Sequence, residues 1–307
     1  MNNIFAKESK LRNWLRRKIK AAEKMNVFSW IVFAFLALLT LSFIIVYLWG
    51  FMTSFKSILE FDTIGNIVGL PEQWTFENFI FVFENFRVKL NGTTFYLEDM
   101  ILNSLLYAVG CAFIQTAVQC IVAYLAAKFR FKFSSVIYWV VIITMTIPVV
   151  GTDISTIQML QNIGLYDSMI GMFVLKFNFL GAYFLVFYAT FRSLPDDYAG
   201  AAYVDGAGEF GILIHIILPM VANMFFTIFL LNLIMYWNDY RTPLLYIPNH
   251  PTLSNGIQWL STSPTQEFSH TTVRITSCII MVIPILIVFI IFKDRIMNKV
   301  SLGGIKE

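Results

Sequence analysis

The most informative stretch of this chain is Gly200-Ala201-Ala202-Tyr203-Val204-Asp205-Gly206-Ala207, which is followed ten residues after its second glycine by Ile216-Ile217-Leu218-Pro219. It is rich in small residues, carries charged residues nearby, and lies between two long apolar runs. Gly206 can adopt the left-handed conformation that ends a helix, and Pro219 is expected to bend the chain where the next apolar run begins. The stretch therefore predicts a short helix outside the bilayer with little side-chain bulk, which permits close approach of another protein.

The composition around this stretch is that of a polytopic membrane protein. The 307 residues are 58% hydrophobic and 13% charged, and the mean hydropathy is +0.70. A helix that crosses about 30 Å of hydrocarbon needs roughly 20 mostly apolar residues, because its backbone groups must be satisfied within the segment. The sequence predicts six spans, at 27–52, 101–127, 134–155, 168–191, 212–238 and 273–292.

Basic residues predict the orientation of these spans. They gather before the first span, between the second and third, and after the last, whereas the connection after the first span is acidic. By the positive-inside rule both termini are cytoplasmic. The first span lacks a cleavage site and is kept as an anchor. The predicted organisation is a basic cytoplasmic leader (1–26), a six-helix membrane domain (27–292) with external loops at 53–99 and 241–270 and a cytoplasmic loop at 192–212, and a cytoplasmic tail (293–307).

The cytoplasmic loop carries its own helix signals. Ser193 is expected to cap the helix, Pro195 to take a first-turn position, and Asp196 and Asp197 to face the positive end of the helix dipole. Tyr203 and its apolar neighbours can fill pockets in a partner. The alternative, that the small residues only let two membrane helices pack, fits poorly with so many carboxylates in one loop.

These residues resemble a known family, the membrane subunits of binding-protein-dependent ABC importers. The family pattern is E-A-A, three residues, G, nine residues, I-x-L-P, and this chain matches it except that Gly200 stands in place of the usual Glu. The motifs Phe191-Arg192-Ser193-Leu194-Pro195 and Trp237-Asn238-Asp239-Tyr240 resemble the carbohydrate branch, specifically the second permease subunit of maltose-type importers. The residues that the resemblance assigns to ATPase coupling are Gly200, Ala201, Ala202, Tyr203, Asp205, Gly206, Leu218 and Pro219.

The resemblance implies an all-α type I ABC importer permease fold in a bacterial cytoplasmic membrane. It implies two ATPase subunits, a second homologous permease that makes a heterodimer, an extracellular or periplasmic solute-binding protein, and a carbohydrate substrate. The chain has no G-x-x-x-x-G-K-[ST], so it binds no cofactor of its own and ATP and Mg belong to the partner ATPase. The tail residues expected to touch that partner are Gly303, Gly304 and Lys306.

Polar residues inside the spans are candidates for the substrate path, because sugars are bound by amides, hydroxyls and aromatic rings. Such residues are costly in a membrane and therefore suggest function, although bonds between helices explain most of them. The candidates are Gln115, Gln119, Asn178, Tyr183, Asn232 and Tyr236. Lys176, near the outer end of the fourth predicted span, either lines a cavity or extends toward the interface.

Three other functions are weighed against the carbohydrate importer. A permease of the same importer class for an amino acid, a peptide or an anion shares the cytoplasmic loop. A secondary transporter would need carboxylates at the bilayer midplane, whereas the acids here gather at span ends. A membrane enzyme would need a catalytic or metal site, but His215, His250 and His270 are scattered. The sequence thus predicts no catalytic residue, no metal site and no nucleic-acid partner.

Overall fold

The computed structural model of the chain describes residues 26–90, 92–129, 133–147, 151–262 and 267–297. Most of the predicted leader and tail lies outside these ranges, as do Gly303, Gly304 and Lys306. The chain divides into two compact units, one ending at Thr75 and one beginning at Phe76. Each unit is described by itself.

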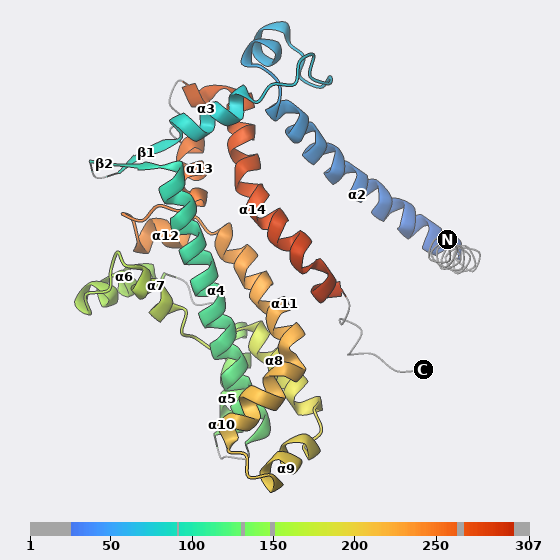
Figure 1. Cartoon of the computed structure of the whole chain (residues 1–307), viewed down its shortest axis with the longest axis vertical. Coiled ribbons are helices and arrows are strands. Elements are labelled where there is room, and N and C mark those ends of the chain that lie inside the picture. The colour runs from blue at the N-terminus through green and yellow to red at the C-terminus, as the bar shows by residue number, and fades with distance from the viewer. Residues whose placement is uncertain (1–25, 91, 130–132, 148–150, 263–266, 298–307) are drawn as a thin grey trace. The chain divides into compact units, whose positions relative to one another are not determined.

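Within the described residues, four helices are long and apolar enough to cross a membrane (Figure 1). One belongs to the first unit and three to the second. They are α2 (Val27–Ser54), α4 (Leu97–Lys128), the continuous helical run Glu209–Trp237, and α14 (Thr271–Met297), which is apolar as far as Phe292. The continuous run is made of α10 (Glu209–Ile212), a π-helical turn (Leu213–Ile217) and α11 (Leu218–Trp237). They match the first, second, fifth and sixth predicted spans.

The third predicted span, 134–155, is wrong as one continuous helix. The structure has a helix α5 (Ser134–Thr146), and a separate helix α6 (Asp153–Asn162) begins near the end of the predicted span. Helix α5 stops because Ile147 is extended, with φ −91° and ψ 112°. The residue before a proline is disfavoured in the helical region, and Pro148 follows.

The fourth predicted span, 168–191, is also divided. It consists of α7 (Met169–Leu175) and α8 (Ala182–Ser193). Between them the Asn178 side chain accepts a hydrogen bond from the Leu180 amide at 2.8 Å, and Gly181 has φ +138°. A local side-chain bond and a conformation that favours glycine together replace the helix here.

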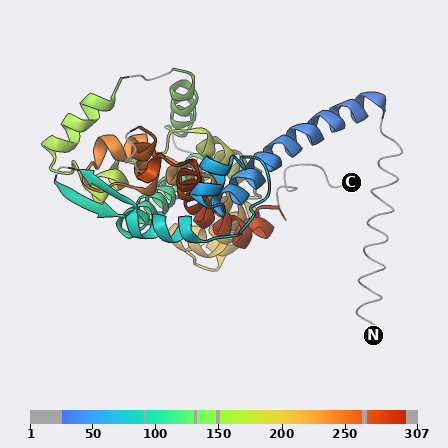
Figure 2. The same ribbon diagram turned by 90° about the horizontal axis from the view of Figure 1, so that it is seen from above.

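The long helices of the second unit form its core. Helix α4 packs against both α11 and α8, and α14 packs against α11. The centre of this packing is aromatic, with Phe184, Phe187 and Phe191 of α8 fully buried. Helix α6 lies at the edge of the unit in both views (Figure 2).

The connections outside the core correct the expectation of an all-α fold. The segment before α4 contains helix α3 (Glu77–Asn85) and an antiparallel hairpin of β1 (Arg87–Leu90) and β2 (Thr93–Tyr96), in which Arg87 pairs with Tyr96. Gly92 lies between the two strands and has φ +83°. The protein is therefore mostly helical with one small hairpin.

The predicted loop 241–270 is folded rather than open. It contains α12 (Arg241–Tyr246), α13 (Leu253–Thr262) and a 3₁₀ turn (Glu267–Ser269). The Ser104 hydroxyl of α4 accepts a bond from the Leu253 amide at 2.7 Å, and Asn103 donates to the Pro251 carbonyl at 3.1 Å. These bonds hold α13 on the end of α4, a position that the polar composition alone did not indicate.

In the first unit, the chain after α2 folds back on itself. A π-helical turn covers Leu59–Ile64. The fully buried Lys56 donates to the Asn66 carbonyl at 2.7 Å, while the Glu60 carboxylate accepts from the Asn66 side chain and from the Glu72 amide. A lysine and a glutamate are thus buried with their hydrogen bonds satisfied, as burial of charged groups requires.

Candidate functional site

The stretch that the sequence predicted to be cytoplasmic forms helix α9 (Asp197–Val204). Its C-terminus is closed by a Schellman motif, since the Ala207 amide bonds to the Ala202 carbonyl at 2.9 Å and the Gly206 amide to the Tyr203 carbonyl at 3.0 Å. Gly206 has φ +79°, as its position in the sequence predicted. The end of the helix is therefore fixed by backbone conformation.

The N-terminus of α9 differs from the prediction. The helix begins at Asp197, so Pro195 precedes it, and no side chain caps it. Ser193 belongs to the last turn of α8, where its hydroxyl donates to the Thr190 carbonyl at 2.7 Å. The predicted cap is wrong because α8 extends further along the chain than expected.

Lys128 takes the place of a cap in holding this end of the loop. It is the last residue of α4, and its ammonium donates to the Leu194 carbonyl and to the Asp196 carboxylate, each at 2.6 Å. The Lys128 side chain is only 14% exposed, whereas that of Asp196 is 80% exposed. The carbonyl contact is therefore the shielded one, and it ties the loop to α4.

The small residues of α9 do not share one role. Ala202 is buried in the apolar cluster around Tyr124, Phe191 and Ile212. Gly200 is exposed, and a Cβ added there would have no heavy atom of the described residues within 4 Å. Ala202 therefore faces the body of the protein, while Gly200 lies on a free surface.

The exposed face of the loop is partly apolar. Val204 is 89% exposed and Phe210 is 74% exposed. Ala201, Asp205 and Gly206 are exposed beside them. On the same face, hydrogen bonding to the Glu209 carboxylate raises the pKa of Tyr203 to about 12. The phenol thus stays protonated at physiological pH, and the surface presents large apolar groups beside carboxylates.

Pro219 lies inside a continuous helical run rather than at a sharp bend. The π-helical turn Leu213–Ile217 immediately precedes Leu218 and Pro219, which open α11. Proline lacks an amide hydrogen, and its ring needs room against the preceding turn. The wider turn supplies that room, so the chain passes from the loop into the membrane helix without a break.

Three of the predicted path residues take part in bonds that join α11 to α4. The Tyr236 hydroxyl donates to the Gln115 side-chain oxygen, and the Asn232 amide donates to Thr116 at 2.9 Å. Asn232 and Tyr236 are almost fully buried. These polar groups therefore hold α4 and α11 together.

The other path candidates lie around the break between α7 and α8. Gln119 is buried, donates weakly to the Leu180 carbonyl at 3.4 Å, and leaves its side-chain oxygen without a protein partner among the described residues. Asn178 forms the turn described above, and Tyr183 is half-buried against the apolar cluster. The structure thus places Gln119 and Asn178 at the break between α7 and α8.

Sequence reasoning did not find the neighbours of Tyr236. The ring of Tyr107 packs edge-on against it at 5.8 Å between centroids, and the Lys176 ammonium lies 4.9 Å from its ring centre. The Tyr107 hydroxyl donates to Asp239 at 2.9 Å. Lys176 therefore lies over an aromatic ring of α11, and both of its predicted positions stay predictions.

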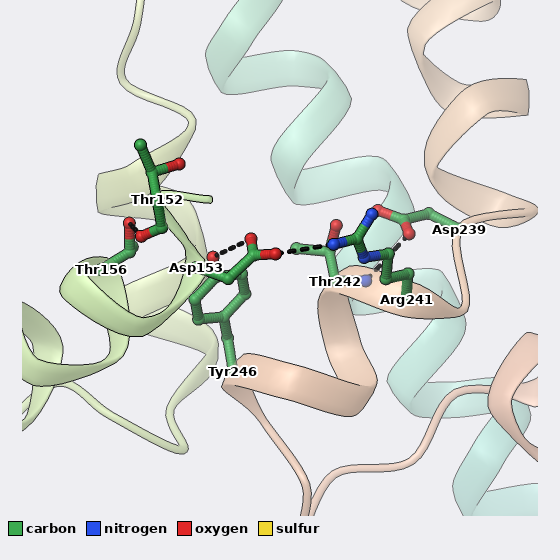
Figure 3. Close-up of polar contacts among 7 residues, drawn as sticks. All are labelled: Thr152, Asp153, Thr156, Asp239, Arg241, Thr242 and Tyr246. Atoms are coloured by element: carbon green, nitrogen blue, oxygen red, sulfur yellow. Dashed lines mark hydrogen bonds and ion pairs between the residues drawn. The ribbon is translucent and has the colours of Figure 1, made fainter. Parts of the chain in front are cut away.

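A polar cavity between α6 and α12 was also not predicted (Figure 3). Asp153 lies 88 residues before Arg241, and their side chains form an ion pair at 2.7 Å. The Tyr246 hydroxyl donates to the same carboxylate at 2.9 Å. No local motif links residues so far apart in the chain, so only the fold reveals the cavity.

Comparison with known proteins gives a consistent picture. Residues 119–302 match the family described as "Binding-protein-dependent transport system inner membrane component". The diacetylchitobiose uptake system permease protein NgcG of Streptomyces coelicolor is 28% identical over 286 residues, which cover 92% of this chain and 91% of that protein. The sn-glycerol-3-phosphate transport system permease protein UgpE of Yersinia pestis is 32% identical over 155 residues, which cover 50% of this chain and 54% of that protein.

A solved structure shares the fold. It is the crystal structure of a bacterial ABC transporter involved in the import of the acidic polysaccharide alginate, and one of its chains aligns with a TM-score of 0.70. The alignment covers 87% of this chain and 96% of that chain at 21% sequence identity. At this identity the likeness is one of fold.

Proposed function

Because this chain belongs to the family of binding-protein-dependent transport system inner membrane components, we propose that it is the permease subunit of an ATP-driven importer for a carbohydrate. Permease subunits of ABC importers have no ATPase site of their own, so a partner subunit hydrolyses ATP and a binding protein delivers the solute. The relative that covers nearly the whole chain is a diacetylchitobiose permease, which supports a sugar as the substrate.

The observation that carries this proposal is the construction of α9. The helix is closed by the Schellman motif at Gly206, tied to α4 through Lys128, and packed inward through Ala202. A short helix attached at three points can transmit a force to the helices behind it. Its exposed face is free to enter a cleft of the ATPase. We assign this coupling role to Gly200, Ala201, Ala202, Tyr203, Asp205, Gly206, Leu218 and Pro219.

In this proposal ATP binding and hydrolysis in the partner move α9, and the membrane helices rock so that a central path opens alternately to each side. The path includes Gln115, Gln119, Asn178, Tyr183, Asn232 and Tyr236. The divided helices supply the third and fourth crossings, which gives six spans with both termini in the cytoplasm. The partners are two ATPase subunits and a second, different permease, and the tail residues Gly303, Gly304 and Lys306 contact the ATPase pair.

A second candidate substrate class is favoured by one observation. UgpE, a permease for sn-glycerol-3-phosphate, is similar over half of this chain. A phosphorylated or otherwise anionic solute in the same importer class is therefore the alternative. Uptake assays with neutral sugars and with sn-glycerol-3-phosphate distinguish the two.

The test is purification of the chain in mild detergent from its native membrane. We expect an ATPase subunit to co-purify, and its absence would contradict the proposal. In the reconstituted complex, Gly200→Arg should abolish uptake and uncouple ATP hydrolysis while leaving the permease folded, because a Cβ added at Gly200 meets no heavy atom within 4 Å among the described residues. Ala202→Arg is the matched comparison, and it should unfold the loop because Ala202 is buried. Normal uptake by the Gly200→Arg complex would refute the coupling role.

A further inference from the structure

The cavity between α6 and α12 has a volume of about 270 Å³. It is lined by Gly151, Thr152, Asp153, Arg241, Thr242, Leu245 and Tyr246. Pockets for drug-sized ligands are usually about 300 to 1,000 Å³. This cavity is just below that range and suits one sugar-ring-sized group.

The two charged side chains that line the cavity have hydrogen-bonding positions that their bonds within the described residues do not use. The two oxygens of Asp153 each accept one bond, from Arg241 and from Tyr246 (Figure 3), whereas a carboxylate has about four acceptor positions. Arg241 uses one Nη2–H in the described part of the chain, and a guanidinium has five N–H donors. Thr152 and Thr242 also line the cavity.

The ion pair itself is poorly explained as a stabilising contact. The Arg241 side chain is 72% exposed and that of Asp153 is 40% exposed. Exposed pairs contribute little to stability. A donor and an acceptor held side by side at a cavity wall are, however, suited to binding neighbouring hydroxyl groups of a ligand.

The charge of the cavity indicates the class of ligand. One carboxylate and one guanidinium balance each other, and the other polar side chains that line it are uncharged hydroxyls. A cavity without net charge does not favour an anion or a cation. It favours a neutral molecule with many hydroxyl groups.

The cavity is connected to the predicted path through Asp239. One oxygen of Asp239 accepts a bond from the Thr242 amide at 3.0 Å, and the other accepts from the Tyr107 hydroxyl at 2.9 Å. Tyr107 in turn packs against Tyr236. Thr242, which lines the cavity, and Tyr107, which packs against the predicted path, are thus bonded to the same carboxylate behind the lining residues.

We propose that the cavity between α6 and α12 is a subsite for one ring of a neutral carbohydrate, in which Asp153 and Arg241 bind its hydroxyl groups before the sugar enters the path. This inference rests on the proposed function and narrows it to uncharged sugars. Tyr246 orients the Asp153 carboxylate through its hydroxyl.

The experiment is ligand-observed saturation-transfer NMR on the purified permease complex in detergent, with the binding protein omitted. The probes are N,N′-diacetylchitobiose, maltose and glucuronic acid. We expect a signal from at least one of the neutral disaccharides and a weaker one from glucuronic acid. Asp153→Asn and Arg241→Gln should each weaken binding by about tenfold or more, because each changes a charge-assisted hydrogen bond to the sugar.

Asn249→Ala is the matched control. Asn249 bonds to the Asp167 carboxylate through its side chain at 2.6 Å and so joins the same two parts of the chain without lining the cavity. Its binding should equal that of the wild type. If Asp153→Asn or Arg241→Gln fails to assemble, Thr242→Val, which leaves the ion pair intact, should still weaken binding several-fold.

Wild-type binding in the Asp153 and Arg241 variants would overturn the inference, as would a stronger signal from glucuronic acid than from both neutral sugars. Uptake is measured first on the wild-type complex, in proteoliposomes with its binding protein. A complex that imports no sugar contradicts the proposed function itself. A complex that imports a neutral sugar without any saturation-transfer signal from that sugar contradicts only the subsite.

Discussion

Lys128 is the residue on which the position of the loop that carries α9 depends most directly. Its ammonium contacts a backbone carbonyl and a carboxylate that lie 66 and 68 residues further along the chain. The sequence placed Lys128 among the basic residues of a cytoplasmic turn, which agrees with a topogenic role. It gave no sign of these two partners, because they are brought to the end of α4 by the packing of α8.

We expect Lys128→Met to destabilise the complex by about 1 to 3 kcal/mol, because a hydrogen bond from a charged group to the Leu194 carbonyl is lost. Thermal unfolding in detergent measures this change. Asp196→Asn is the control and should cost less than about 1 kcal/mol, since the Asp196 carboxylate is 80% exposed. Equal losses in the two variants would contradict the importance of the carbonyl contact.

The burial of Ala202 could not be read from the sequence motif that contains it. The sequence grouped Ala202 with Gly200 as parts of a surface of low bulk. In the structure only Gly200 is on that surface, and Ala202 packs against the body of the protein. A motif gives the spacing of small residues, but the direction that each one faces depends on how the helix docks.

Among the elements, helix α9 is the clearest success of sequence reasoning. Its existence and its end at Gly206 follow from local conformational preferences, which act over a few residues. Its beginning was predicted two residues too early, because α8 continued through Ser193. Helix starts depend on where the preceding element stops, which the local sequence specifies less strongly.

We expect Gly206→Ala to destabilise the loop by about 1 to 2 kcal/mol, because φ of +79° is unfavourable for a residue with a Cβ. Gly200→Ala should instead stabilise α9 by up to about 1 kcal/mol, because alanine favours helix more than glycine does. Hydrogen–deuterium exchange of the peptide that covers α9 measures both effects. Faster exchange in the Gly200→Ala variant would contradict this assignment.

The contact of α7 with α4 is another feature that only packing explains. A Cβ added at Gly110 of α4 would lie 2.3 Å from the Phe173 ring of α7. Nothing in the local sequence identifies Gly110 as the point where another helix comes close. The broken span between α7 and α8 is positioned in part by this contact.

Gly110→Ala should therefore destabilise the protein by about 1 to 3 kcal/mol through overpacking. Phe173→Leu in the same chain should restore part of the loss by making room, and Phe173→Leu alone serves as the control. Thermal unfolding of the three variants measures the coupling. Strictly additive effects would show that the two side chains do not compete for the same space.

At the scale of the whole chain, the arrangement to test is how the chain crosses the membrane. In the part of the chain that the structure describes, four helices are long and apolar enough to span it, and two further predicted spans are divided. The proposed six crossings place the loop at α9 on one side and α13 on the other. Labelling from outside the cell can test this arrangement directly.

We expect Ser261→Cys to react with a membrane-impermeant maleimide in intact cells, and Asp205→Cys to react only after the membrane is permeabilised. Both positions are exposed. The background for both is a chain in which Cys111, Cys120 and Cys278 are replaced by alanine, and that chain without a new cysteine is the control. Labelling of both positions from outside would contradict the proposed topology.

The long apolar helices and the cap at Gly206 could be predicted because hydrophobic length and backbone preference are local properties. The interruptions at Ile147 and Gly181 were missed because a window of apolar residues does not register a single proline or a local side-chain bond. The ion pair of Asp153 with Arg241, and the burial of Ala202, arise from residues distant in the chain. Such contacts exist only once the helices have packed, so the tertiary structure alone decided them.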